Sequence, residues 1–292
     1  MPRKPRLHLP GGLYHVILRG NNRQAIFYAD LDRRRWMRLL GAGIDRYRCR
    51  IHAYCWMSNH IHMAVQVSDF HLGRLIKSVA SQYARATNKR LNRSGHLFER
   101  RYRGKLVDAD AYLLQLVRYI HDNPVTAGIV DDPARYPWSS HRAYLGYYRP
   151  SILTTDWVLG LFDQERSRAV RGYAEFMAID HQVSAELIEG NQRDERLIGD
   201  DAFIQRIVAE YSIRRSGSTL TSLIAEHCQR YGISEAELAS SHRSRLHARL
   251  RSEIAVAALE AGIATLHEVA RRFNRSDSAL CHSIRHLYNS RR

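Results

Sequence analysis

Along the first third of the chain, short hydrophobic runs rich in β-forming residues are separated by polar and turn residues, a pattern that predicts short strands. Four segments carry β-forming residues bounded by turn residues: 13–19, 50–57, 60–67 and 101–107. The first of them ends at the turn cluster Gly20-Asn21-Asn22. The short Ser58-Asn59 connection joins the second and the third into a hairpin.

Between these strands, apolar residues recur at the spacing of a helix. The spacing predicts helices over 30–47 and 70–91. It predicts a third helix that begins after Asp108 as its N-cap and ends near Asn123-Pro124. The order β-α-β-β-α-β-α predicts an α+β fold, in which helices pack on a ferredoxin-like antiparallel sheet.

The pattern changes in the second half of the chain. Residues 149–199 have a helical but ambiguous pattern, and we interpret them as a helical connecting region. After Gly199 each periodic segment predicts a helix: 202–211, 220–231, 234–240, 243–261, 265–273 and 277–289. The sequence therefore predicts three parts, which are 1–148, 149–199 and an all-α domain over 200–292.

The charge of the chain indicates a polyanionic partner. Its 292 residues include 45 Lys and Arg against 29 Asp and Glu, a net charge of +16. Such a surplus favours nucleic acid or an anionic membrane surface. No apolar run approaches the roughly 20 residues of a spanning helix, so we expect DNA and no membrane. The four scattered cysteines indicate a reducing cytoplasm and exclude a disulfide framework or a structural zinc site.

Two histidines mark the start of the third predicted strand, in the segment Asn59-His60-Ile61-His62. Side chains two apart on a strand point to the same face, so both imidazoles can reach one metal ion. The alternative is that one histidine caps the hairpin and the other packs in the sheet.

A tyrosine and an asparagine share one face of the third predicted helix, since Tyr119 and Asn123 are spaced i,i+4. The alternative is that Tyr119 is a packing residue and that Asn123 ends the helix before proline. Tyr112, on nearly the same face, and Tyr102, in a basic stretch, are the other tyrosines that geometry allows as a nucleophile.

Taken together, the two motifs resemble those of the HUH single-tyrosine transposases, and more closely the REP-associated tyrosine transposases. The resemblance covers about residues 11–146. It consists of these blocks: Arg19-Gly20-Asn21-Asn22-Arg23, Trp56-Met57-Ser58-Asn59-His60-Ile61-His62, Gly95-His96-Leu97-Phe98-Glu99-Arg100-Arg101-Tyr102-Arg103, Tyr119-Ile120-His121-Asp122-Asn123-Pro124-Val125 and Trp138-Ser139-Ser140.

The resemblance implies that His60 and His62 bind a divalent metal and that Tyr119 is the nucleophile. It places Asn123 as a further metal ligand. Two imidazoles and an amide oxygen suit Mn²⁺ at least as well as Mg²⁺. A metal on the scissile phosphate neutralises developing charge, which a weakly nucleophilic phenol requires. The attack would leave a 5′-phosphotyrosine and a free 3′-hydroxyl.

The third metal ligand stays open at this point, because His121 and Asp122 adjoin Asn123 in the sequence. Candidate DNA contacts in the first part of the chain are Arg19, Asn22, Arg23, Arg100, Arg101, Arg103 and Lys105. The last four lie with Phe98 and Tyr102, a mixture suited to phosphate contacts and base stacking. The alternative is a solvated, charged edge strand.

Residues 265–287 predict a helix-turn-helix, with a small helical bundle as the alternative. Residues 204–288 resemble the DNA-binding domain of the replication initiator DnaA. The segment Asn274-Arg275-Ser276-Asp277-Ser278 departs from that family's Arg-Asp-His-Thr-type run, so duplex binding is implied without origin specificity. Candidate DNA contacts here are Arg243, Arg245, Arg275 and Ser278. Together with Arg249 and Arg251, Arg243 and Arg245 form a basic helix that we expect to face the DNA.

The sequence therefore predicts a metal-dependent single-strand DNA endonuclease and strand transferase that acts on hairpin, REP-like DNA. The main alternative is a non-catalytic DNA-binding regulator derived from such a transposase. A replication-initiating or plasmid-nicking HUH enzyme is a third, although the helicase domain common in that class is not in the sequence. We expect a bacterial, nucleoid-associated protein of the cytoplasm that is a monomer or a homodimer.

Overall fold

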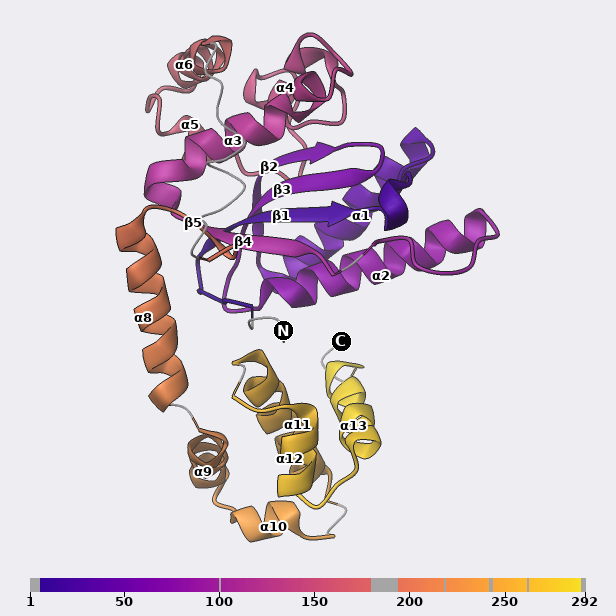
Figure 1. Ribbon diagram of the computed structural model, residues 1–292, viewed down its shortest axis with the longest axis vertical. Helices are drawn as coiled ribbons and strands as arrows, with labels where there is room; N and C mark the ends of the chain where they lie inside the picture. Colours follow the sequence, from indigo (N-terminus) through magenta and orange to yellow (C-terminus); the bar gives the residue numbers. More distant parts are fainter. Residues whose placement is uncertain are drawn as a thin grey trace. The chain divides into compact units, whose positions relative to one another are not determined.

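The computed structural model describes residues 6–99, 101–179, 194–217, 219–241, 244–261 and 263–289. Two compact units divide them, one made of Arg6–Ile204 and one that contains Gln205–Arg292 (Figure 1). The sequence-based boundary at residue 199 therefore lies close to the boundary between the compact units. Among the described residues, no helix is long and apolar enough to cross a membrane.

A five-stranded sheet forms the centre of the first unit, in the order β2-β3-β1-β4-β5. Its strands are β1 (Leu13–Arg19), β2 (Arg50–Trp56), β3 (His60–Gln66), β4 (Arg103–Val107) and β5 (Leu197–Ile198). The first four pair antiparallel in the ferredoxin-like order, which confirms the predicted α+β fold. The strand β5 pairs parallel to β4 and was not predicted, because two residues show no alternation.

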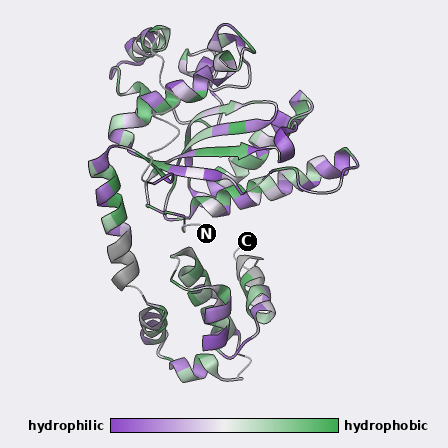
Figure 2. Ribbon diagram, viewed as in Figure 1, coloured by the Kyte–Doolittle hydropathy of each residue, from purple (hydrophilic) through white to green (hydrophobic). Residues whose placement is uncertain are grey.

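Helices α1 (Asp30–Tyr47) and α2 (Leu72–Arg90) cover one face of the sheet. Trp36 of α1 is fully buried between Trp56 of β2 and Tyr83 of α2, with ring centroids 6.2 and 5.4 Å away. Figure 2 shows hydrophobic residues concentrated along the strands that these helices cover. The burial of such aromatic side chains provides a large part of the hydrophobic stabilisation of this layer.

Helix α3 (Ala109–Thr126) packs on the opposite face, against β2 and β3. It continues past Pro124, whereas the sequence predicted an end near Asn123-Pro124. Proline removes only the one N–H that would bond to the carbonyl four residues earlier, at Ile120. The next turn still closes, because the Ala127 N–H donates to the Asn123 carbonyl at 3.0 Å.

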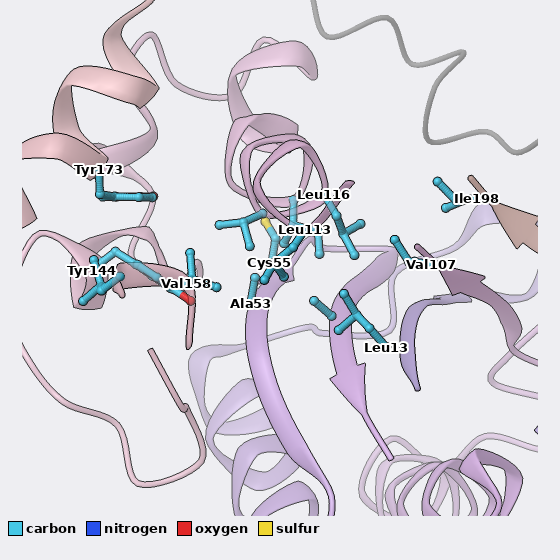
Figure 3. Packing of buried hydrophobic residues seen from close by; sticks show 14 of the residues in the cluster. Leu13, Ala53, Cys55, Val107, Leu113, Leu116, Tyr144, Val158, Tyr173 and Ile198 are labelled. Atoms are coloured by element: carbon cyan, nitrogen blue, oxygen red, sulfur yellow. The ribbon is translucent and has the colours of Figure 1, made fainter. Parts of the chain in front are cut away.

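Three further helices pack into the same hydrophobic cluster as α3, namely α4 (His141–Tyr144), α5 (Asp156–Leu159) and α6 (Arg166–Ala178). Figure 3 shows Tyr144, Val158 and Tyr173 in one hydrophobic cluster with Leu113 and Leu116 of α3. Part of the segment 149–199 thus packs into the first unit and supports the helix that carries Tyr119.

The second unit is all-α, as the sequence predicts. After α8 (Asp201–Gly217), which spans the boundary between the units, come α9 (Leu220–Tyr231), α10 (Glu235–Ala239), α11 (Arg245–Glu260), α12 (Leu266–Arg272) and α13 (Asp277–Asn289). Capping boxes at Thr219, Ser234 and Thr265 fix three of the helix starts. Ile254, Phe273 and other apolar residues form its core.

Candidate active site between the sheet and helix α3

The two histidines of the predicted metal site lie at the first and third positions of β3, on the face that α3 covers. Their ring centroids are 4.9 Å apart. In the register of the sheet, His60 lies opposite Arg19 and His62 lies opposite Ile17. His62 is buried and His60 is half-buried, so the pair forms the floor of a partly enclosed site.

Tyr119 and Asn123 project from α3 toward these histidines. The ring centroid of Tyr119 lies 5.6 Å from that of His62, in an edge-to-face arrangement. The Asn123 side chain is within hydrogen-bonding reach of His60. Its Nδ2 also donates to the Tyr119 carbonyl at 2.7 Å. The packing of α3 on the sheet therefore brings together the four residues that the resemblance implied.

Hydrogen bonds fix which atoms of His60 and Asn123 carry lone pairs. Asn59 Nδ2 donates to the Arg23 carbonyl at 3.1 Å, which turns Asn59 Oδ1 toward His60. The Nδ1–H of His60 donates to this oxygen at 2.6 Å, so a neutral ring keeps a lone pair on Nε2. The bond from Asn123 Nδ2 to the Tyr119 carbonyl likewise leaves Asn123 Oδ1 as an acceptor. These two atoms, His60 Nε2 and Asn123 Oδ1, are therefore the ones that can offer lone pairs to a cation.

Burial keeps both imidazoles neutral. Desolvation, with a smaller effect from the nearby Arg19 charge, lowers the pKa of His60 to about 4. Desolvation and the neighbouring His15 hold the pKa of His62 well below its usual value. A neutral imidazole is the form that binds a metal ion. Both histidines are therefore available as ligands at neutral pH.

His15 of β1 is a site residue that the sequence reasoning missed. Its Nε2 lies 3.0 Å from Nδ1 of His62, and its ring is 5.5 Å from that of Tyr119. His15 is 1% exposed, and desolvation lowers its pKa to about 3. The signal in the sequence was a histidine inside the hydrophobic strand LYHVILR, but only the register of β1 against β3 shows what it contacts.

The protein side chains alone would leave a metal ion incompletely coordinated. In the part of the chain that the structure describes, no group of three or more His, Cys, Asp or Glu side chains could hold a metal ion. The available donors are the imidazoles of His60 and His62 and the amide oxygen of Asn123. This set fits a divalent ion whose other ligands are water and phosphate oxygens, as an open catalytic site requires.

His121 and Asp122, the two alternative residues for the third ligand, face away from His60 and His62. His121 is fully buried, with Nδ1 2.8 Å from the Tyr173 hydroxyl and Nε2 2.7 Å from Ser140 Oγ. Asp122 is half-buried, and its charge acts on Tyr173; burial raises the pKa of Asp122 to about 6. Asn123 is thus the residue of these three that the structure brings to His60.

The alternative tyrosines are not next to the histidines. Tyr102 lies under the guanidinium of Arg6, whose carbon is 4.0 Å from the ring centroid, and its hydroxyl approaches Gly73 of α2. Tyr112 is half-buried and packs against the hydrophobic cluster that contains Leu113 and Leu116. Tyr119 has the ring contacts with His15 and His62.

Basic residues from two segments surround the histidines. Arg103 and Lys105 of β4 lie opposite Ile17 and His15 of β1, and paired residues point to the same face of a sheet. Arg19 is exposed beside His60, and Arg101 is exposed just before β4. Arg100 lies outside the described residues.

The turn after β1 adds Asn22 and Arg23, both exposed, at the edge of the site. The Arg23 carbonyl accepts the bond from Asn59, which ties this turn to the start of β3. The turn requires glycine at position 20, because a Cβ there would come within 2.0 Å of the Gln24 carbonyl oxygen.

The candidate DNA contacts of the second unit divide into two groups. Arg245 and Ser278 are exposed. Arg275 donates to the carbonyls of Ser240 and Asn274, so its guanidinium is engaged within the unit. Arg251 was expected on a basic surface, but it is 6% exposed and donates to the Leu238 carbonyl at 2.6 Å. Arg243 lies outside the described residues.

Comparisons with known proteins bear on the first unit. Residues 10–123 match the family described as "Transposase IS200 like". A solved structure described as "Structure of the REP associates tyrosine transposase bound to a REP hairpin" aligns with 51% of this chain and 89% of that chain. The aligned residues are 17% identical, and the TM-score is 0.45. No curated protein matches the chain.

Proposed function

Since residues 10–123 match the family of IS200-like transposases, we propose that this protein cuts and rejoins single-stranded DNA with Tyr119 as its nucleophile. The observation that carries the proposal is the convergence of Tyr119 and Asn123 on His60 and His62 from opposite sides of one site. Neither spacing alone distinguishes catalysis from packing, whereas their meeting provides both a nucleophile and metal donors.

His60, His62 and Asn123 would hold a divalent metal ion, Mg²⁺ or Mn²⁺, through two neutral imidazoles and one amide oxygen. When bound, such an ion polarises the scissile phosphate and neutralises charge on its oxygens. The Tyr119 oxygen attacks phosphorus and gives up its proton to solvent. The bond from phosphorus to the 3′-oxygen breaks, this oxygen takes up a proton to become a free 3′-hydroxyl, and the 5′-phosphate stays bound to the tyrosine. Reversal of this step by a free 3′-hydroxyl rejoins the strands.

Hairpin DNA, such as a REP-like element, is the proposed substrate. Arg19, Arg103 and Lys105 support it, because they lie on the same sheet face as the histidines and can contact phosphates of a strand that enters the site. Arg245 and Ser278 of the second unit are proposed to contact duplex DNA.

Covalent capture tests the proposal. Hairpin oligonucleotides from the DNA that flanks the gene, incubated with the protein and Mn²⁺ or Mg²⁺, should form a protein–DNA adduct that survives denaturing electrophoresis. Tyr119→Phe removes one oxygen and should abolish the adduct while hairpin binding persists. Tyr112→Phe is the matched control on the same helix and should retain the adduct.

The alternative function is a non-catalytic DNA-binding regulator. Wild-type protein that binds hairpin DNA but never forms an adduct with either metal would support this regulator. If Tyr119→Phe still cleaves without an adduct, a water molecule is the nucleophile, and the protein is a hydrolytic nuclease.

A further inference from the structure

A basic groove of about 400 Å³ lies between α1 and α2, on the solvent side of this helix pair. Trp36 and Leu40 of α1 are fully buried toward the sheet, so the groove lies on the sheet face opposite to α3. Four cationic side chains, one amide and two apolar side chains line it: Arg35, Arg38, Arg85 and Lys89, then Gln82, then Leu39 and Ala86.

The charge of this groove is not neutralised by the protein. Helix α2 carries five Lys and Arg residues and no Asp or Glu. Of the α1 carboxylates nearby, Asp30 lies 3.6 Å from Arg33, and the buried Asp32 is 2.7 Å from Arg90. Among the residues that the structure describes, none of the four groove cations has an ion pair. A groove with this charge excess favours an anionic ligand.

The arrangement of the cations fits a chain of phosphates. Arg35 and Arg38, like Arg85 and Lys89, are one turn apart, which separates their Cβ atoms by about 5–6 Å. Packed helices lie about 8–10 Å apart, so the four charges form an extended array and not one convergent pocket. No aromatic side chain lines the groove, so it lacks the stacking surface typical of single-strand binding.

We propose that the groove formed by Arg35, Arg38, Arg85 and Lys89 binds the sugar-phosphate backbone of duplex DNA, apart from the site under α3. The proposal rests on the proposed function, because it assigns the groove to the same DNA. A helix layer and a sheet layer separate the two sites by roughly 20 Å. At 3.4 Å per base pair, a duplex needs at least about six base pairs to extend from one to the other.

The test compares hairpins with a short stem and with a stem extended by ten base pairs of arbitrary sequence. Binding to the full-length protein is measured by fluorescence anisotropy between 50 and 200 mM salt. The groove variant combines Arg35→Gln, Arg38→Gln, Arg85→Gln and Lys89→Gln. The control variant removes four exposed charges elsewhere in the same unit: Arg48→Gln, Arg50→Gln, Arg149→Gln and Arg171→Gln.

For the long stem, each lost phosphate contact lowers the slope of log K against log salt by about 0.9. If all four cations contact phosphates, the wild-type protein loses about 150-fold more affinity than the groove variant over this salt range. The control variant should keep the wild-type gain in affinity from the longer stem. The groove variant should lose that gain and still form the Tyr119 adduct with the short hairpin.

A groove variant that keeps the gain from the longer stem overturns the inference. The inference would also be overturned if the groove variant lost binding to phosphatidylserine vesicles while its binding of long-stem DNA was unchanged. The ligand of the groove would then be a membrane surface. Arg85→Gln with Lys89→Gln gives a milder variant, with about half the change in slope, should the fourfold variant not fold. If wild-type protein forms no adduct, the proposed catalysis fails, and the comparison of stem lengths still tests the groove.

Discussion

Replacing His15 by phenylalanine tests whether this histidine orients His62 as a metal ligand. For His62 to offer its Nε2 lone pair to a metal, its proton must lie on Nδ1, and the acceptor within reach is Nε2 of His15 at 3.0 Å. Phenylalanine preserves a ring in this fully packed position but accepts no hydrogen bond. His15→Phe therefore leaves the buried N–H of His62 without its partner.

Two effects of different size follow from this geometry. Loss of a hydrogen-bonding partner behind a metal-binding histidine typically weakens metal affinity by about 10–100-fold. An unpaired buried N–H also destabilises the fold by about 1–3 kcal/mol. At about 2–4 °C per kcal/mol for a unit of this size, the melting temperature should fall by several degrees. The loss of metal affinity distinguishes an orienting role from a purely structural one.

Isothermal titration with Mn²⁺ measures the affinity directly, without DNA or turnover. His15→Gln should recover most of it, because its side-chain oxygen can accept the same bond. His52→Phe is the matched control, since His52 is also buried and bonds to Thr154 and Gln66 away from the site. That control should lose stability and keep the wild-type affinity. Wild-type Mn²⁺ affinity in folded His15→Phe would refute the orienting role.

Three other perturbations test the metal site, the hydrogen bonds that support α3 and the burial of the neutral histidines. His60→Ala should abolish adduct formation and leave hairpin affinity within about threefold, because binding rests on many phosphate contacts; wild-type cleavage would contradict the metal site. Tyr173→Phe should destabilise the first unit by about 1–3 kcal/mol in urea unfolding, because His121 and His141 lose the hydroxyl 2.8 and 2.5 Å away. Stability should be constant near pH 7 and fall as the pH drops from about 6.5 toward 4, because the unfolded chain protonates His60 and His15 before the folded chain does. Melting temperatures at each pH check this, and a flat profile would contradict the burial of these neutral imidazoles.

Helices α1, α2 and α3, the helices after Gly199 and the four long strands could be predicted because their signals are local. The β-forming residues of 13–19 and 60–67 and the helical spacing in 30–47 depend only on neighbouring residues. The packing of residues 156–178 against α3 could not be predicted, because it depends on contacts between residues far apart. Tyr173 and His121 meet across 52 positions of the chain.

The residues of the candidate site likewise divide into those that local spacing in the sequence reveals and those that it does not. His60 with His62, and Tyr119 with Asn123, each share a face through the period of one strand or one helix. His15 joins them through the pairing of β1 with β3, which no spacing in the sequence reveals. The sequence also does not reveal whether a basic side chain points toward solvent or into the core. Arg251 and Arg245 lie on one helix, yet one is buried against the Leu238 carbonyl and the other is exposed.

The position of Tyr119 depends on residues beyond the segment that matches the transposase family. That segment ends at residue 123, whereas Ser140, His141 and Tyr173 lie after it. On the front of α3, Asn123 bonds back to the Tyr119 carbonyl at 2.7 Å. On the side of α3 that faces away from the histidines of β3, His121 forms hydrogen bonds with Tyr173 and Ser140. These bonds fix the rotation of α3 about its own axis. A turn of α3 by one residue would carry Tyr119 about 100° away from the histidines. The later helices therefore help to position Tyr119, the proposed nucleophile, and changes in them should alter cleavage although they contact neither DNA nor metal.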